Sequence, residues 1–172
     1  SNAAPTVSAN PLVIGATSGA AVQSTPYKIT YDQMKSALSA ADTDGAWFSF
    51  VVTKISNGTV WKGSSPLSTY PAAPVGEAPG SALIGPNEEI IYVPTLNLSG
   101  DAVEVMRVRV FDGLDYSAEA VVAVKIVALN QVPTMTDVQL MGPAIQAIAY
   151  PFTYDALRLK TNASDVEEPL PT

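Results

Sequence analysis

Residues 103–133, VEVMRVRVFDGLDYSAEAVVAVKIVALNQVP, decide the fold of this chain. In the first part of the stretch, apolar side chains such as Met106 and Val108 alternate with the charged Arg107 and Arg109. An alternation with a period of two is typical of a β-strand that is buried on one side. We therefore expect a long one-sided strand here.

A second strand of the same kind follows after a turn. The turn falls at residues 112–115, Asp-Gly-Leu-Asp, where Gly permits chain reversal and Asp can accept hydrogen bonds from turn amides. After it, one phase of the alternation is apolar and consists of Ala118, Ala120, Val122, Val124 and Ile126. Two long antiparallel strands with one apolar side need a second apolar layer over them, so the sequence predicts an antiparallel β-sandwich.

The composition favours an all-β protein without catalytic chemistry. Apolar residues make up 47% of the chain, enough for a core, and 14 Pro with 11 Gly suit many turns between short strands. The net charge is −7 with nine Lys and Arg, so we expect no nucleic-acid partner, whose phosphates need a basic face. No apolar run approaches the ~20 residues of a membrane span, so we expect no membrane insertion. The absence of His and Cys removes the commonest general base, thiolate metal sites and disulfides, and we expect no enzyme.

Further short strands are predicted along the chain, at 27–31, 48–53, 59–62 and 90–94, with an edge strand at 5–16 interrupted by Pro11. Asn57-Gly58 is typical of a two-residue hairpin turn that would pair residues 59–62 with the strand before it, with Val60 inward. Asp32 is the expected cap of a brief helical turn. Residues 64–87 contain five Pro and are predicted to form a long irregular surface insertion.

The opening of the chain recurs near its end. Ile29-Thr30-Tyr31-Asp32 returns as Phe152-Thr153-Tyr154-Asp155, and residues 40–44 return as Ala163-Ser164-Asp165-Val166-Glu167, both at an offset of 123. Pro5-Thr6 returns as Pro133-Thr134. A match at constant offset indicates tandem repeats. We therefore expect residues 1–3, Ser-Asn-Ala, to be the scar of a removed expression tag, 4–132 to form one complete repeat, and 133–172 to be the N-terminal fragment of a second repeat.

Several short motifs in this order and spacing resemble a family, the cadherin-like, immunoglobulin-fold tandem repeats of large bacterial surface adhesins and repeat-containing toxins. The motifs are Ile-Thr-Tyr-Asp at 29–32, Ala-x-Asp-x-Asp-Gly at 40–45, Asn-Gly-Thr at 57–59, Gly-Pro-Asn-Glu at 85–88, Phe-Asp-Gly at 111–113 and Leu-Asn-Gln-Val-Pro at 129–133. The resemblance implies an immunoglobulin-like sandwich of about seven strands. It also implies a secreted or cell-surface module that acts in adhesion or as a spacer, with neighbouring repeats of the same chain, and a cell-surface protein or glycan, as partners.

Some members of such families bind calcium between neighbouring repeats. By position, Asp42 and Asp44 match the Asp-x-Asp pair and Asp112 matches the Asp before the hairpin turn, so the resemblance implies these three as calcium ligands. The linker of the family usually reads Asp-x-Asn-Asp-x-Pro, whereas residues 128–133 read Ala-Leu-Asn-Gln-Val-Pro. Calcium takes six to eight oxygen ligands, so we expect weak or absent binding in this isolated fragment. In the alternative interpretation, Asp42 and Asp44 only accept bonds from turn amides.

Trp47, Trp61 and Tyr70 are candidates for an aromatic surface that binds a sugar, because both Trp residues take the outward phase of their strands. This interpretation gives the alternative function, a carbohydrate-binding module of a secreted glycan-active protein. The ordinary interpretation is that these aromatics cover the outer face of a sheet. Asp112 and Asp115 would suit a glycosidase pair by type, but they share one turn, where no cleft is implied.

The tail at 133–172 lacks the central hairpin that would cover its apolar side chains. A pair of strands without further layers is marginal in water. We expect the tail to fray, to pack on the first repeat, or to pair with the edge of a neighbouring chain and give a dimer. Its apolar density favours packing or pairing over disorder.

Overall fold

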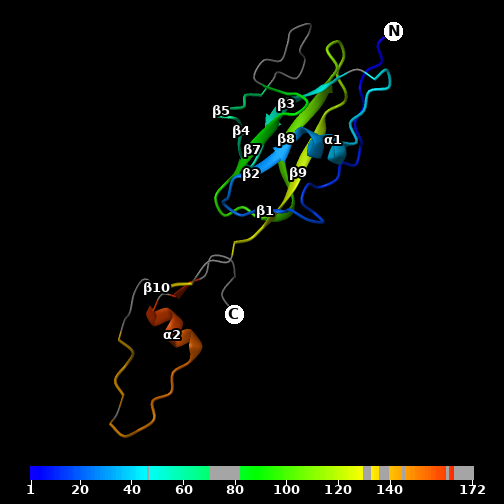
Figure 1. Ribbon diagram of the computed structural model, residues 1–172. Helices are drawn as coiled ribbons and strands as arrows, with labels where there is room; N and C mark the ends of the chain where they lie inside the picture. Colours follow the sequence, from blue (N-terminus) through cyan, green and yellow to red (C-terminus); the bar gives the residue numbers. More distant parts are fainter. Residues whose placement is uncertain are drawn as a thin grey trace. The chain divides into compact units, whose positions relative to one another are not determined.

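The computed structural model describes residues 1–45, 47–69, 82–129, 133–135, 140–144, 146–161 and 163–164. The chain divides into two compact units, Ser1–Ala128 and Leu129–Thr172 (Figure 1). No helix among the residues described is long and apolar enough to cross a membrane.

The first unit consists of two β-sheets and one helix, so the predicted all-β class is confirmed for the part that the structure describes. The five-stranded sheet contains, in spatial order, β1 (Ala21–Val22), β9 (Ala120–Val127), β8 (Gly100–Phe111), β3 (Ser49–Ile55) and β6 (Leu83–Ile84). The four-stranded sheet contains β2 (Tyr27–Thr30), β7 (Glu89–Pro94), β4 (Gly58–Lys62) and β5 (Ser65–Pro66). Figure 1 shows α1 (Tyr31–Leu38) alongside β9.

The predicted central hairpin is confirmed. β8 and β9 pair antiparallel, with Met106 opposite Val122 and Val108 opposite Ala120. Met106 and Val108 are fully buried, and the turn between the strands falls where the Asp-Gly-Leu-Asp sequence places it. The alternation of the sequence thus identified both strands and most of the buried face of each, but Ala118, predicted on the buried face of the second strand, precedes β9 and is exposed.

One core holds the two sheets together. Ile29 and Tyr92 of the four-stranded sheet belong to the same buried cluster as Phe50 and Val108 of the five-stranded sheet. Helix α1 adds Met34 and Leu38, both fully buried, to this cluster. Each large apolar side chain removed from water contributes about 1.5–3 kcal/mol, so the shared core is the main source of stability.

The predicted Asn57-Gly58 hairpin is wrong. β3 pairs with β8 and β6, whereas β4 pairs with β7 and β5, so the chain passes from one sheet to the other between β3 and β4. The Asn57 side-chain amide donates to the Glu104 carbonyl of β8 (2.9 Å), and the Asn57 carbonyl accepts from Thr95 N beyond β7 (2.9 Å). These bonds to both sheets fix the crossing. Val60 is buried as predicted, but it lies in the four-stranded sheet, where β4 pairs with β7, and not in a hairpin with β3.

The start of α1 also differs from the prediction. Thr30, not Asp32, is the N-cap, because its hydroxyl accepts from Gln33 N and the Gln33 side chain accepts from Thr30 N, a capping box. Asp32 lies in the first turn, where a carboxylate faces the positive end of the helix dipole. With this cap the helix runs for eight residues, longer than the brief turn that was expected.

The remaining strands differ from the sequence-based expectation in length and number. Within the described part of the first unit there are nine strands, against about seven expected, and three of them have only two residues. In place of an edge strand at 5–16, Thr6 and Ile14 form isolated bridges to Ala41 and Val124. The predicted insertion at 64–87 begins and ends in short strands, with Ile84 fully buried. Residues 70–81 of that insertion lie outside the described residues.

The second unit contains β10 (Thr134–Met135), α2 (Tyr154–Thr161) and β11 (Ala163–Ser164). Helix α2 begins like α1, since Ala156 N donates to the Thr153 hydroxyl at 3.1 Å, just as Gln33 N donates to the Thr30 hydroxyl at 3.1 Å. The pairing around the helix recurs as well. Thr6 bridges Ala41 antiparallel in the first unit, and Thr134 pairs antiparallel with Ser164 in the second.

The apolar side chains of the second unit are exposed where their counterparts in the first unit are buried. Ile29 and Met34 are 0% exposed, whereas Phe152 and Leu157, 123 residues later, are 59% and 42% exposed. The first unit has the long strand β9 packed against α1, whereas the described part of the second unit has no long strand to cover its helix.

Candidate functional site

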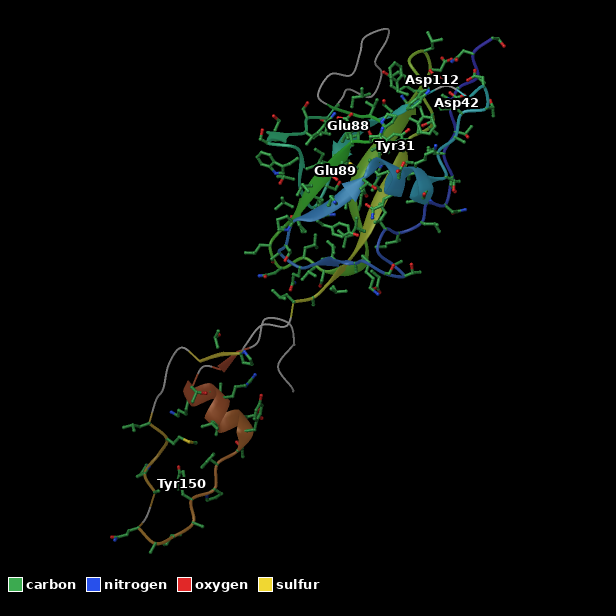
Figure 2. The ribbon with its side chains drawn as sticks, viewed as in Figure 1. Tyr31, Asp42, Glu88, Glu89, Asp112 and Tyr150 are labelled. Carbon is green, nitrogen blue, oxygen red and sulfur yellow. The ribbon has the colours of Figure 1, made fainter. Side chains whose placement is uncertain are left out.

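The three candidate calcium ligands form one acidic cluster at the end of the first unit where α1 is followed by a loop and β8 turns into β9. Figure 2 shows Asp42 and Asp112 at this end. The pKa of Asp42 lies above its ordinary value, because its carboxyl shares a hydrogen bond with that of Asp44, is partly desolvated, and faces the charges of Asp44 and Asp112. The loop and the hairpin turn therefore bring like charges together.

Asp112 is held by protein donors. Its Oδ1 accepts from the backbone N–H groups of Leu114 (2.7 Å) and Asp115 (2.8 Å), and its Oδ2 accepts from the Asn2 side-chain amide (2.9 Å). The same amide donates to Asp115 Oδ2 at 2.8 Å. Partial burial acts to raise the pKa of Asp112, but these hydrogen bonds outweigh it and the net pKa lies below the ordinary value.

Amide donors already use several of the carboxylate oxygens that a calcium ion would need, two of these donors belonging to Asn2 and Ala3 of the expected tag scar. Asp42 Oδ1 accepts from Asp44 N (3.1 Å) and Asp44 Oδ2 accepts from Ala3 N (2.9 Å), so most carboxylate oxygens already bind amides. Asp42 Oδ2 is buried and accepts no hydrogen bond from an amide. Among the described residues there is no group of three or more Asp, Glu, His or Cys that could hold a metal ion. Weak or absent calcium binding remains a prediction.

The three candidate aromatics do not form one described surface. Trp47 is 80% exposed and lies in the loop before β3. Trp61 lies on β4, is half-buried, and its indole N–H donates to the Thr59 hydroxyl at 3.2 Å. Tyr70 lies outside the described residues. Of the three candidates, Trp47 is therefore the one that the structure places open to a ligand.

A hollow of about 360 Å³ lies beside Trp47. Three segments that are distant in sequence line it. Helix α1 contributes Asp32 and Lys35, the loop contributes Trp47 and Phe48, and the turn before β7 contributes Asn87. Sequence reasoning did not single out Lys35 or Asn87, because nothing local in the sequence indicates that these three segments meet.

Tyr31 fixes the wall of this hollow. Its hydroxyl donates to the Phe48 carbonyl at 2.8 Å, and its ring lies 6.0 Å from that of Phe48 and 5.2 Å from that of Phe50. Lys35 Nζ lies 5.4 Å from the centre of the Phe48 ring, a cation–π contact. Burial, together with the charge of Asp32, raises the pKa of Tyr31 to about 12, so its hydroxyl stays protonated and can donate.

The turn that carries Asn87 is fixed as well. Tyr31 N donates to the Glu88 carbonyl at 3.0 Å, which joins the start of α1 to this turn (Figure 2). The Glu88 carboxylate accepts from Gly85 N at 2.7 Å and forms an ion pair with Lys62. Asn87 itself takes a left-handed conformation with φ of 63°. All three walls of the hollow are thus attached to the core of the first unit.

Comparison of the chain with protein-family models, with curated proteins and with solved structures found no significant match in any of the three.

Proposed function

We propose that this chain is a non-enzymatic repeat module of a large bacterial surface protein, secreted or held at the cell surface, which acts in adhesion or as a spacer. In this proposal the first unit is an immunoglobulin-like, cadherin-like sandwich and residues 133–172 begin the next repeat. Its partners are the neighbouring repeats and a protein or glycan on another surface.

The observation that carries the proposal is the recurrence of one local structure, in which the helix cap returns after 123 residues and the leading Thr6 returns as Thr134 after 128 residues. Thr30 and Thr153 cap the two helices with the same hydrogen bond, 123 residues apart. The antiparallel pairs Thr6–Ala41 and Thr134–Ser164 enclose these helices in the same way. Tandem copies of one sandwich are the architecture of stacked repeat proteins, in which each module contacts only its neighbours. The two sheets around one core in the first unit support the sandwich part of the proposal.

The test is the location of the native protein and the effect of the isolated chain on attachment. Antibodies raised against residues 1–128 are expected to label intact cells, and brief protease treatment of the cells should remove the label. Added in excess, the chain should reduce attachment of the cells if the module is adhesive and leave it unchanged if the module is a spacer. Labelling that requires permeabilised cells would contradict the proposal.

The second candidate function is a carbohydrate-binding module, which one observation favours. Trp47 is the exposed aromatic among the described residues of the first unit, and it lies beside a hollow with polar walls. A module with an extended binding strip would use several exposed aromatics in a row. Because Trp61 is half-buried with its N–H bonded, the described residues of the first unit offer a single exposed stacking position, at Trp47. The two candidates differ in whether a glycan alone, without a second protein, binds the chain.

A further inference from the structure

We propose that the hollow beside Trp47 is a binding site for one neutral hexopyranose unit, with Trp47 as the stacking platform and Asp32, Lys35 and Asn87 as hydrogen-bonding groups. The proposal rests on the second candidate function, glycan binding, and is independent of the repeat proposal. It names the site, the residues and the class of sugar.

The platform is an indole ring that the fold leaves open. At 80% exposure, Trp47 keeps a large apolar face in water although the core of the first unit is a short distance away in sequence, at Phe48 and Phe50. A pyranose ring presents a flat face of C–H groups, which can cover such a face while its hydroxyls stay polar. Trp suits such a contact, because its ring packs against the apolar C–H face of a sugar while its N–H can donate to a hydroxyl or to water.

The walls supply free hydrogen-bonding groups of both kinds. Among the described residues, the Asp32 carboxylate, the Lys35 ammonium and the Asn87 amide form neither a hydrogen bond nor an ion pair through their side chains, and the Trp47 N–H has no acceptor. Trp61 differs, because its N–H is used within the protein. A carboxylate accepts from sugar hydroxyls, an ammonium donates to them, and an amide does both. This set matches the mixed donor and acceptor pattern of a sugar.

The charge and the volume of the hollow restrict the class of ligand that it can bind. Asp32 and Lys35 carry opposite charges on the same wall, so the hollow has no net charge that would favour an anionic sugar or a phosphate. Its volume of about 360 Å³ lies at the small end of the range for ligand sites, roughly 300–1,000 Å³, and suits a single ring.

The hollow is held in shape before any ligand enters. The Tyr31 hydroxyl bonds the Phe48 carbonyl, Lys35 lies over the Phe48 ring, and Tyr31 N bonds the Glu88 carbonyl. These contacts join helix, loop and turn, so that binding does not have to order the three segments. Preorganised sites lose less of their interaction free energy to ordering.

The experiment uses the two Trp residues as internal probe and control. The full ¹⁵N-labelled chain is titrated with the methyl glycosides of glucose, galactose, mannose and N-acetylglucosamine, and the two indole N–H signals are followed by NMR. Trp61→Phe assigns the signals. With at least one glycoside, the Trp47 signal is expected to move in a saturable way while the Trp61 signal stays in place.

Variants then test the assignment to the hollow. Trp47→Ala should weaken binding by at least tenfold, because stacking on the indole is the main apolar contact, whereas Trp61→Phe should stay within twofold of the parent chain. Asp32→Asn changes an exposed carboxylate, and Lys35→Ala removes an ammonium that also lies over the buried Phe48 ring. Each variant is expected to weaken binding severalfold, and its spectrum is compared with that of the parent chain to check that the fold is unchanged. If a glycoside binds but all three hollow variants bind as well as the parent, the site assignment is wrong and glycan binding survives. If no glycoside moves either indole signal, both are wrong.

Discussion

Tyr31 joins the core to the proposed sugar site through one hydrogen bond, from its hydroxyl to the Phe48 carbonyl. Tyr31→Phe removes this bond and leaves the buried carbonyl without its donor, so we expect a loss of about 1 kcal/mol in the free energy of unfolding. The variant should also increase the mobility of the loop at Trp47, which the line width of its indole signal will report. An unchanged unfolding free energy and line width would contradict the role given to Tyr31.

The same residue predicts a pH dependence. The pKa of Tyr31 is raised from 10.0 to about 12 in the folded chain, because burial and Asp32 disfavour the phenolate. A raised pKa means that the stabilisation is complete below pH 10 and is lost as the pH rises toward 12. The melting temperature of the parent chain should therefore fall more steeply between pH 10 and 12 than the melting temperature of Tyr31→Phe. Parallel pH profiles for the two chains would show that Tyr31 is not the group responsible.

Asp42 tests whether the acidic cluster is a cation site or only a set of turn carboxylates. The pKa of Asp42 is raised by its hydrogen bond with the Asp44 carboxyl, by partial desolvation, and by the charges of Asp44 and Asp112. Asp42→Asn keeps an oxygen for Asp44 N and removes the charge that these surroundings disfavour. We expect a higher melting temperature at pH 7, and a smaller gain at a pH low enough to protonate Asp42. Calorimetric titration of the parent chain should show calcium binding that is millimolar or weaker. Micromolar binding that Asp42→Asn abolishes would contradict this account.

The sequence predicted the position of the acidic cluster better than that of the hollow, for a physical reason. The family resemblance grouped Asp42, Asp44 and Asp112 by motif position, and in the structure Asp42 and Asp112 follow a helix and a strand of the first unit. The hollow depends on Lys35 and Asn87, which lie on a helix face and in a turn that meet only after both sheets have formed. Local sequence patterns do not indicate that this helix face and this turn line the same hollow.

At the scale of elements, Gly58 makes the passage from β3 to β4 feasible. Its φ is 149°, and a Cβ atom at this position would lie 2.2 Å from the Val93 carbonyl oxygen in β7. Gly58→Ala should therefore lower the free energy of unfolding by about 3 kcal/mol or more, through backbone strain and displacement of β7. Gly63 also has positive φ, 62°, but its Cβ would meet nothing within 4 Å. As a control, Gly63→Ala should lose only about 1–2 kcal/mol. Equal losses in urea unfolding of the two variants would overturn this explanation.

The same crossing shows why one strong turn signal misled the sequence interpretation. Asn57-Gly58 indicates that the chain can reverse there, and the dipeptide does contain two positive φ values. It does not specify which strand will be the partner. The central hairpin was predictable because two long strands, each with one apolar side, flank its turn. Both strands bury that side, on which Val108, for example, is fully buried. Between β3 and β4 the strands are shorter, and the partners β8 and β7 decided the pairing.

At the scale of the whole molecule, the exposed apolar side chains of the second unit predict its behaviour in solution. Leu140, Phe152 and Leu159 are 94%, 59% and 72% exposed. Burying each would contribute about 1.5–3 kcal/mol, so we expect the tail to pack on the first unit or to pair with another chain. Hydrogen exchange and light scattering across concentrations will compare the full chain with one that ends at Pro133. Tail amides that exchange at random-coil rates, together with two monomeric chains, would contradict the prediction.

In the proposed function, residues 133–172 begin a second copy of the same sandwich. If so, the opening of the second copy should be able to replace that of the first, in a chain made of residues 129–167 followed by residues 45–128. We expect this chain to be less stable than residues 1–128, because Lys160 and Thr161 take the places of the buried Ala37 and Leu38.

The measurement is cooperative unfolding of this chimera by calorimetry, with hydrogen exchange of the helix at Tyr154–Thr161, against a control in which residues 129–167 are scrambled. The account predicts one cooperative transition and protected helix amides in the chimera, with neither in the control. A chimera that behaves like the scrambled chain would contradict the claim that the two units are copies of one module.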